Sequence, residues 1–346
     1  MDWVASVRFT CVFCWGKAPF VFLRCNLFTA SLAREWYTNR KSSSAGGTKV
    51  EQVRYGGLEA GGTKMVCGVA NEKGEWLAKL TIPTKHPQET MPEIIAFFEE
   101  QQIDSLGIGS FGPLDLVKGS STYGSLASTP KKGWPGYSLL GAFAHLNIPI
   151  SITTDVNGAA LAEAAVGAAK GLDSCVYITV GTGIGAGAVV NGTILEGLSH
   201  PEMGHIPVVR HKDDRYEGNC PYHGDCLEGL AAGPAIQGRW GKAGVELAEV
   251  SEVWEMEAYY LAQAIATYTY VLSPKRVILG GGVMKQRHLY PLIRQALATQ
   301  INGYVKIGDL EEYVVPPGLG DDAGLTGAVL LAKQALVQKG LKSTNL

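Results

Sequence analysis

Four side chains of the types that bind zinc lie close together in the sequence. The stretch GNCPYHGDCLE contains Cys220, His223 and Cys226 at intervals of three residues, and His205 precedes them in HPEMGH. Two thiolates and two imidazoles complete a closed tetrahedral site. The pattern therefore predicts a structural zinc ion bound by these four residues. A disulfide bond between Cys220 and Cys226 is the alternative.

A carboxylate suited to proton transfer follows a predicted strand. In IPISITTDVNGAALAEAAVGAAK, residues 148–170, an apolar strand ends at Asp155 and continues into an alanine-rich helix. Ligands of α/β proteins bind at the carboxyl ends of strands, and a carboxylate there can accept the proton of a hydroxyl group during phosphoryl transfer. We therefore expect Asp155 to be a general base. The alternative is that Asp155 or Asn157 only caps the helix.

The segment PEMGH places Glu202 close to His205. A carboxylate and an imidazole can form hydrogen bonds with neighbouring hydroxyl groups of a sugar. We therefore expect both residues to bind the acceptor substrate. The alternative for Glu202 is a solvated surface charge.

The elements that must position these residues follow a repeated pattern. A strand, a Gly-Gly-Thr turn, a second strand, an Asn-to-Gly turn and a third strand are predicted in the segment YGGLEAGGTKMVCGVANEKGEWLAKLTIP. The same order is repeated in the segment SCVYITVGTGIGAGAVVNGTILEG. In the second copy Asn191-Gly192 is typical of a two-residue hairpin. The duplication predicts two similar α/β domains that face each other across a cleft.

Three glycine-rich loops predict a nucleotide site. Backbone N–H groups without neighbouring side chains can approach phosphate oxygens, and a threonine hydroxyl adds a donor. The loop in VILGGGVMK could also hold an adenine ring or a ribose against its backbone. Each loop alone could be an ordinary tight hairpin, but together they favour nucleotide binding. The residues are Gly61, Gly62, Thr63 and the adjoining Lys64; Gly181, Thr182 and Gly183; and Gly280, Gly281 and Gly282.

Two other nucleotide-binding motifs are disfavoured. The P-loop pattern G-x-x-x-x-G-K-[ST] does not occur. GTGIGA, residues 181–186, fits the dinucleotide pattern, and Glu202 follows about 20 residues later. That motif requires a helix after the loop, whereas GAVVNGTILEG predicts strand, turn and strand. We therefore do not expect a Rossmann site.

Composition limits the class of protein. The 346 residues, 46% of them hydrophobic, can form a large core and two domains, and a net charge of −2 gives no indication of nucleic-acid binding. The seven cysteines are an odd number, and two belong to the predicted metal site. A reducing, cytoplasmic location is therefore expected. No apolar run reaches the ~20 residues of a membrane-spanning helix.

Residues 1–54 differ from the rest of the chain. They contain eight Lys or Arg against three Asp or Glu, and three of the seven cysteines. No helical or strand periodicity persists through them, so we expect a disordered extension outside the folded domains. The alternative is a transit peptide, which is typically rich in arginine and poor in acidic residues.

Several of these segments together resemble the ROK (repressor, open reading frame, kinase) family of sugar kinases, and in particular its bacterial fructokinase branch. They are LEAGGTK, TTDVNGAALAE, VGTGIGAG, PEMGH with the cysteines and histidine that follow, LGGGVM, GIGSFGPLDL and STYGSLASTPKKGW. The resemblance extends from about Gly56 to Ala335. It implies two actin-like, ribonuclease-H-type domains flanking a nucleotide and sugar cleft, ATP with Mg²⁺ as donor, a Zn²⁺ ion that braces the sugar pocket, and a homodimer.

The resemblance also implies roles for single residues. Asp155 corresponds to the catalytic base, Glu202 and His205 to the sugar contacts, and Glu59 to a residue near the magnesium ion. The expected ATP contacts are Thr182, Pro234 in AAGPAI, and the loop Gly280, Gly281, Gly282, Val283 and Met284. We expect an N-terminal domain over residues 55–172 and a C-terminal domain over 173–340, whose last helix packs on the N-terminal domain.

Three positions depart from the family pattern. Glu59 stands where the family usually has Asp, Thr154 where it has Asn, and C-x-x-H-x-x-C replaces C-x-C-x-x-x-x-C. The first two differences favour fructose over glucose as the substrate. The third exchanges a cysteine ligand for His223 and leaves the number of ligands unchanged.

The expected activity is ATP-dependent phosphorylation of D-fructose to fructose 6-phosphate. Kinases of mannose, glucose or an N-acetylated hexosamine are alternatives, and no sequence feature excludes mannose. The family also contains sugar-sensing repressors, which carry an N-terminal winged-helix domain. Residues 1–54 are too short for that domain, so a repressor is disfavoured.

Overall fold

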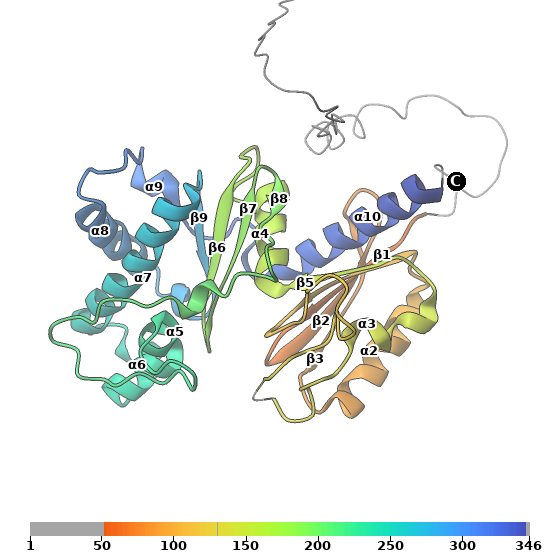
Figure 1. Ribbon diagram of the computed structural model, residues 1–346, viewed down its shortest axis with the longest axis horizontal. Coiled ribbons are helices and arrows are strands. Elements are labelled where there is room, and N and C mark those ends of the chain that lie inside the picture. The colour runs from red at the N-terminus through yellow and green to blue at the C-terminus, as the bar shows by residue number, and fades with distance from the viewer. Residues whose placement is uncertain (1–51, 130, 344–346) are drawn as a thin grey trace, which may run out of the picture. The chain divides into compact units, whose positions relative to one another are not determined.

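Two five-stranded sheets with the same strand order form the framework of the folded chain (Figure 1). The computed structural model describes residues 52–129 and 131–343, so nearly all of the proposed extension lies outside the described residues. The sheets have the orders β3-β2-β1-β4-β5 and β8-β7-β6-β9-β10. In each sheet the first three strands are antiparallel and the last two run parallel to the first. This repetition confirms the prediction of two similar α/β domains.

The strands are β1 (Tyr55–Ala60), β2 (Lys64–Ala70), β3 (Trp76–Pro83), β4 (Ser105–Ser110), β5 (Ile150–Thr154), β6 (Cys175–Val180), β7 (Ile184–Val190), β8 (Thr193–Ile194), β9 (Val277–Gly280) and β10 (Val314–Val315). The α-helices are α2 (Pro87–Gln101), α3 (Leu139–Ala142), α4 (Asp155–Ala165), α5 (Leu227–Ala231), α6 (Gly233–Trp240), α7 (Ser251–Leu272), α8 (Leu289–Ile301), α9 (Leu310–Tyr313) and α10 (Ala323–Ser343). Short 3₁₀ helices are η1 (Ala144–Leu146), η2 (Met203–His205), η3 (Gly244–Leu247), η4 (Val283–Lys285) and η5 (Gly320–Asp322). None of the helices in the described part of the chain has the length and apolar character needed to cross a membrane.

Each sheet has a hydrophobic core on its outer face. In the first sheet, apolar side chains of β1, β2 and β4 pack against α2 and α3, and Phe98 of α2 meets Phe143 edge to face at 5.9 Å between ring centroids. In the second sheet, side chains of β6, β7 and β9 pack against α5, α7 and α8. Because these cores are separate, each sheet is stabilised on its outer face without help from the other.

The inner faces of the sheets are covered by exchanged helices. Helix α4 follows β5 of the first sheet but packs mainly on β6 and β7 of the second. Helix α10 follows the last strand of the second sheet but packs on β1, β4 and β5 of the first, as Figure 1 shows. The two helices also pack closely against each other. The chain therefore crosses twice between the sheets.

The contact between α4 and α10 brings backbone against backbone. A Cβ atom at Gly327 of α10 would occupy the place of the carbonyl group of Gly158 in α4. A Cβ atom at Gly107 of β4 would likewise collide with the carbonyl oxygen of Ala328 in α10. Glycine at these positions lets the helices approach more closely than any side chain would allow.

The folded part of the chain begins before residue 55. The backbone N–H of Arg54 donates to Asp104 Oδ2 at 2.8 Å, and the Asp104 N–H donates to the Arg54 carbonyl oxygen at 2.8 Å. The Arg54 guanidinium also donates to the carbonyl oxygen of Gln101 at 2.8 Å. A domain boundary placed after residue 54 cuts through these contacts.

We predict that Gly327→Ala lowers the free energy of unfolding by about 1–3 kcal/mol, because the added methyl group must displace the Gly158 backbone. Gly340→Ala in the same helix is the matched control, since among the described residues a Cβ there would meet no atom within 4 Å. Alanine is the better helix former, so the control should be stabilised by up to about 1 kcal/mol. Urea unfolding of both variants measures the difference. A Gly327→Ala variant as stable as the wild type would contradict the packing described here.

Candidate active site and metal centre

Two acidic side chains, Glu59 and Asp155, line a cavity of ≈ 350 Å³ together with Lys64. Glu59 lies near the end of β1 and its carboxylate is close to Gly324, in the first turn of α10. Asp155 is the first residue of α4, and its Oδ1 accepts a hydrogen bond from the Val156 N–H at 2.9 Å. Each carboxylate thus lies at the N-terminus of one of the two exchanged helices.

The surroundings of both carboxylates favour the protonated form. Burial raises the pKa of Asp155 to about 6, and the negative charge of Glu202 acts in the same direction. Burial, followed by the charge of Asp155, raises the pKa of Glu59 to about 7, against the opposing effects of Lys64 and a hydrogen bond from the Leu325 backbone. A carboxylate with a pKa near 6 is ionised at neutral pH and still accepts a proton readily, as a general base must.

The cap of helix α4 is Thr154. Its hydroxyl oxygen accepts a hydrogen bond from the Asn157 N–H at 3.2 Å. The alternative role for Asp155 or Asn157 as the helix cap is therefore wrong, because a neighbouring residue supplies it. The Asp155 carboxylate remains directed into the cavity.

The three glycine-rich loops are placed differently around the cavity. The third loop lines the cavity through Gly280, Gly281, Gly282 and Met284, and Lys64 lines it as well. The other predicted nucleotide contacts do not line the cavity; they are Gly61, Gly62, Thr63, Gly181, Thr182, Gly183, Pro234 and Val283. The Gly181 carbonyl oxygen accepts from the Gly233 N–H at 2.8 Å, and a Cβ at Gly181 would lie 3.8 Å from the nitrogen of Gly282. The loop at Gly181 and the start of α6 therefore border the loop at Gly280–Gly282. The loop at Gly61 lies elsewhere, next to Thr84, whose hydroxyl donates to the Gly61 carbonyl oxygen at 2.7 Å.

The cavity contains residues that sequence reasoning missed. Lys285 and Arg287 add positive charge to it, and they follow the third glycine loop so directly that their types and position could have indicated them. Tyr290 also lines the cavity and donates to the Leu279 carbonyl oxygen at 2.6 Å, which no local sequence signal indicates.

A buried carboxylate fixes one wall of the cavity. Glu163 of α4 accepts hydrogen bonds from the N–H groups of Ala168 at 2.6 Å, Gly318 at 3.0 Å and Leu319 at 3.0 Å. The last two belong to the loop whose residues Pro317, Gly320 and Asp321 line the cavity. Glu163 therefore ties that loop to the same helix that carries Asp155.

Glu202 lies close to Asp155 but does not line the cavity. Its Oε1 is 2.9 Å from Nε2 of His200, a residue not identified from the sequence. The His200 side chain is 8% exposed and that of Glu202 is 53% exposed. Both atoms lie about 4 Å from the place of a Cβ at Gly112, in the loop after β4. His200 thus holds Glu202 at the junction of the two sheets.

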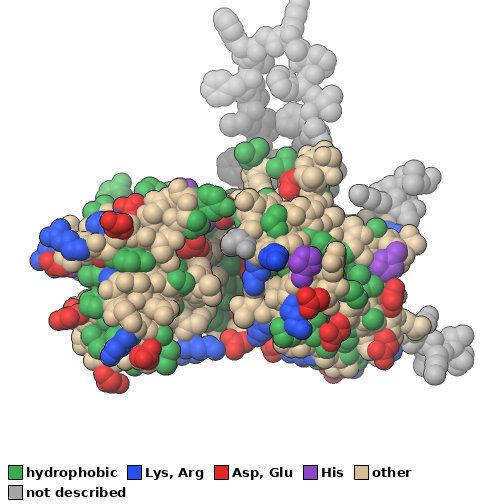
Figure 2. All heavy atoms as spheres, turned by 90° about the horizontal axis from the view of Figure 1, so that it is seen from below, with side chains coloured by type: hydrophobic (Ala, Val, Ile, Leu, Met, Phe, Trp, Pro, Cys, Tyr) green, Lys and Arg blue, Asp and Glu red, His purple; other side chains and the backbone are tan. Residues whose placement is uncertain are grey.

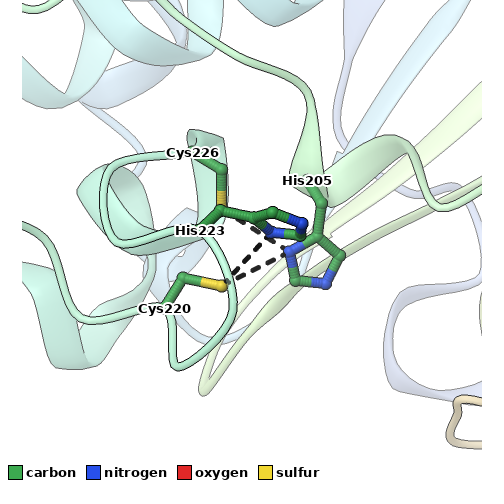
Figure 3. Close-up of side chains that lie close together, drawn as sticks. All are labelled: His205, Cys220, His223 and Cys226. Atoms are coloured by element: carbon green, nitrogen blue, oxygen red, sulfur yellow. Dashed lines mark hydrogen bonds between the residues drawn. The ribbon is translucent and has the colours of Figure 1, made fainter.

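The four predicted metal ligands come together in one cluster (Figure 3). His205 Nδ1 lies 3.7 Å from Cys220 Sγ and 3.5 Å from Cys226 Sγ, and His223 Nδ1 lies 3.6 Å from Cys220 Sγ. All four ligand atoms lie within 4.8 Å of one another. With zinc bonds of about 2.05 Å to nitrogen and 2.3 Å to sulfur, the edge of a tetrahedral site is about 3.6 Å. The cluster therefore fits a tetrahedral ion with nitrogen and sulfur ligands.

Local hydrogen bonds form this cluster. Cys220 and Gly224 exchange two backbone hydrogen bonds, at 3.2 and 2.9 Å, which closes a tight turn around His223. Cys226 immediately precedes helix α5, and the N–H of Leu227, its first residue, donates to the Ile206 carbonyl oxygen at 3.0 Å, which brings the turn to His205. Both cysteines are free thiols, so the alternative disulfide is not formed. Burial raises the pKa of the Cys226 thiol to about 11, and a cation is needed to hold it as a thiolate.

Glu228 connects the metal cluster to the second sheet. Its Oε1 lies 4.0 Å from His205 Nε2, and its Oε2 accepts from the Ile184 N–H at 2.9 Å. A carboxylate facing the second ring nitrogen of a metal-bound histidine fixes the orientation of that ring. Sequence reasoning missed Glu228, although its place two residues after Cys226 was a usable signal.

Comparisons with known proteins agree on one family. A family model described as "ROK family" matches residues 55–335. A Bacillus subtilis (strain 168) protein named "Putative fructokinase" is 52% identical over 81% of this chain and 96% of its own length. The fructokinase of Zymomonas mobilis subsp. mobilis is 45% identical over 83% of this chain and 99% of its own length.

A solved structure gives the same result for the fold. The ROK hexokinase from Thermus thermophilus superposes with a TM-score of 0.69 and 26% identity, covering 83% of this chain and all of that chain. The expected actin-like fold with two ribonuclease-H-type domains is therefore confirmed.

We predict that protein purified under reducing conditions contains one zinc ion per chain and that Cys226→Ser loses it, because serine is a poor zinc ligand. The variant should stay folded, since the hydrophobic cores do not include the metal cluster's turn. Cys175→Ser is the matched control, because Cys175 is a buried free thiol outside the cluster. Atomic emission measures the metal, and circular dichroism the fold. Equal zinc contents in the two variants would remove Cys226 from the site.

Proposed function

Because the chain belongs to the ROK family, we propose that it is an ATP-dependent kinase that converts D-fructose to fructose 6-phosphate. Curated relatives named fructokinase, 41–52% identical to this chain, support the substrate and the reaction. The observation that carries the proposal is the position of Asp155. It lines the cavity together with the third glycine loop, and it also lies near the pair formed by Glu202 and His200. A base at that position can reach both a nucleotide and a sugar.

Asp155 would accept the proton from the O6 hydroxyl of fructose. The O6 oxygen then forms its bond to the γ-phosphorus of ATP while the bond from that phosphorus to the β–γ bridging oxygen breaks, and ADP leaves. Such transfers depend mainly on positioning and on neutralising charge. The raised pKa of Asp155 suits it to hold the proton until the product departs.

The basic residues of the cavity would bind the nucleotide. Lys64, Lys285 and Arg287 offer positive charge to phosphate oxygens, and Gly281 and Gly282 offer a backbone without side chains. Glu59 presents carboxylate oxygens, the ligands that Mg²⁺ prefers, close to Lys64. Magnesium bound with ATP would supply neutralisation of the phosphate charge. The other ATP contacts inferred from the family, Thr182, Pro234 and Val283, border this cavity.

Glu202 and His205 would bind the sugar. With Nδ1 of His205 directed at the two cysteines, its Nε2 is left to donate to a sugar hydroxyl or to Glu228. Zinc bound by His205, Cys220, His223 and Cys226 would keep this loop rigid. His200, through its contact with Glu202, would orient the second sugar contact.

The proposal extends to the assembly and location of the protein. We infer a homodimer from the family resemblance, and a cytoplasmic protein from the odd number of cysteines and from free thiols at all four described positions. A kinase of other hexoses is the second candidate, which the similarity to a ROK hexokinase favours.

A panel of hexoses distinguishes these candidates. We expect fructose to give the highest kcat/KM with MgATP, above mannose, glucose and N-acetylmannosamine, because Glu59 and Thr154 depart from the usual family residues. A coupled assay of ADP release measures all four. If glucose or an N-acetylated hexosamine is preferred over fructose, the fructokinase assignment fails; if no hexose is phosphorylated, the kinase assignment fails.

We predict that Asp155→Asn loses about 10²- to 10⁴-fold in kcat, because an amide cannot accept the proton. In the wild type, kcat/KM should rise with pH through about 6, as Asp155 becomes ionised. Asp173→Asn is the matched control, since Asp173 is exposed and pairs with Lys275 at 2.8 Å on the surface. Binding of ATP and sugar, measured by calorimetry, should survive in both variants. Asp155→Asn with at least half the wild-type kcat would exclude Asp155 as the base.

A further inference from the structure

A second cavity, of ≈ 470 Å³, lies on the first-sheet half of the protein and is strongly basic. It is separate from the cavity that contains Asp155, and the two share no lining residue. Its lining residues come from the turn between β3 and α2 and from the loop before α3. They are Thr84, Lys85, His86, Lys131, Lys132 and Trp134.

Hydrogen bonds fix the walls of this basic pocket. Trp134 is fully buried, and its indole N–H donates to the Lys85 carbonyl oxygen at 2.8 Å, which joins the two segments. The Trp134 backbone N–H donates to the Lys131 carbonyl oxygen at 3.1 Å, which closes the turn that carries Lys131 and Lys132. The lysines therefore extend from a fixed backbone.

His86 is also held in place. Its Nδ1 accepts from the Gln88 N–H at 3.4 Å, so in the neutral ring Nε2 carries the proton. The ring lies against Gly133, which has φ +84°, and a Cβ at Gly133 would collide with it. Glycine is required there both by the backbone conformation and by the imidazole.

The positive charge in the pocket is largely uncompensated. Across residues 52–129 and 131–343, the acidic group within ion-pair distance of these lysines is Glu89, at 3.9 Å from Lys85, and Lys131 and Lys132 have no such partner. Helix α2 begins beside the pocket and adds the positive end of its dipole. In Figure 2, Lys or Arg side chains lie next to a His side chain on the right half of the view, with Asp or Glu side chains beside them.

We propose that this basic pocket binds the phosphate group of a small metabolite, as a site distinct from the nucleotide site. Lysine ammonium groups are compact donors suited to phosphate oxygens, whereas the Thr84 hydroxyl already donates to the Gly61 carbonyl oxygen. A volume of ≈ 470 Å³ is sufficient for a phosphate or a sugar phosphate. The chemistry recognised is a phosphate dianion, either free or esterified to a sugar.

The pocket adjoins the loop between β1 and β2. Lys131 Cε lies 3.6 Å from the place of a Cβ at Gly62, and the Thr84 hydroxyl donates to the Gly61 carbonyl oxygen at 2.7 Å. The Thr84 N–H also donates to the Thr63 carbonyl oxygen at 2.9 Å. A phosphate held by Lys131 therefore lies beside the loop that leads directly into Lys64 of the active-site cavity. The bound phosphate group is therefore close enough to influence the conformation of the loop between β1 and β2.

Calorimetry of the full chain tests the proposal without turnover, so its outcome is independent of the proposed kinase activity. The protein is first saturated with a non-hydrolysable ATP analogue, which fills the nucleotide site, and is then titrated with inorganic phosphate or with fructose 6-phosphate. We expect one equivalent of phosphate to bind. Lys131→Ala with Lys132→Ala should weaken this binding by about tenfold or more, because two charge-assisted contacts are removed.

The matched control removes the same charge elsewhere. Lys242→Ala with Lys306→Ala also deletes two exposed lysines, and should bind phosphate as the wild type does. Tighter binding of fructose 6-phosphate than of inorganic phosphate, lost in the Lys131→Ala, Lys132→Ala variant and kept in the control, would identify a sugar phosphate as the occupant. Equal binding of the two ligands would identify the free phosphate group. The proposal is overturned if neither ligand binds beside the analogue, or if both double variants lose affinity equally.

Discussion

The close packing of α4 against α10 is the contact on which the rest of the protein depends. Each helix follows a strand of one sheet and covers the inner face of the other, so neither sheet is complete without the segment that its partner supplies. The contact is possible because Gly158 and Gly327 carry no side chain where the two backbones meet. The two backbones are in direct contact, so a single added methyl group would have to displace a peptide unit. The relative position of the two sheets is therefore set by backbone atoms rather than by adaptable side chains.

This packing also explains the electrostatics of the active site. Glu59 and Asp155 each lie at the start of one of the two packed helices, and the negative charge of Asp155 contributes to the raised pKa of Glu59. The N-terminal ends of both helices offset part of this repulsion, through backbone N–H groups of Val156 and Leu325. Two carboxylates are thus kept close together at an intermediate proton affinity. A bound magnesium nucleotide would remove the remaining repulsion, so the arrangement favours binding of a cation with the substrate.

Much of this arrangement could be predicted from the sequence, and the remainder has a physical explanation. The repeated glycine turns and the change from strand to alanine-rich helix at Asp155 are local patterns, and the local structure follows them. The four candidate metal ligands were identifiable because their residue types are rare in such proximity. His200 was not, because it lies in an irregular segment and acts through its contact with Glu202. Glu228, in helix α5, was missed although its place two residues after Cys226 offered a signal. The exchange of α4 and α10 could not be read from their apolar content, since an alanine-rich helix packs equally well on either sheet.

The exchange of helices has a consequence for the order in which the chain can fold during synthesis. The first sheet is made from residues 55–154, but the helix that covers its inner face spans Ala323–Ser343 and is synthesised after the whole second sheet. Until then that face, with Gly57 and Gly107 on it, lacks α10, the helix that packs against it. The first sheet can therefore form its outer core early but reaches its final packing only after α10 has been synthesised. If synthesis stops before α10, the inner face of the first sheet stays exposed, and chaperones or neighbouring chains could bind to it.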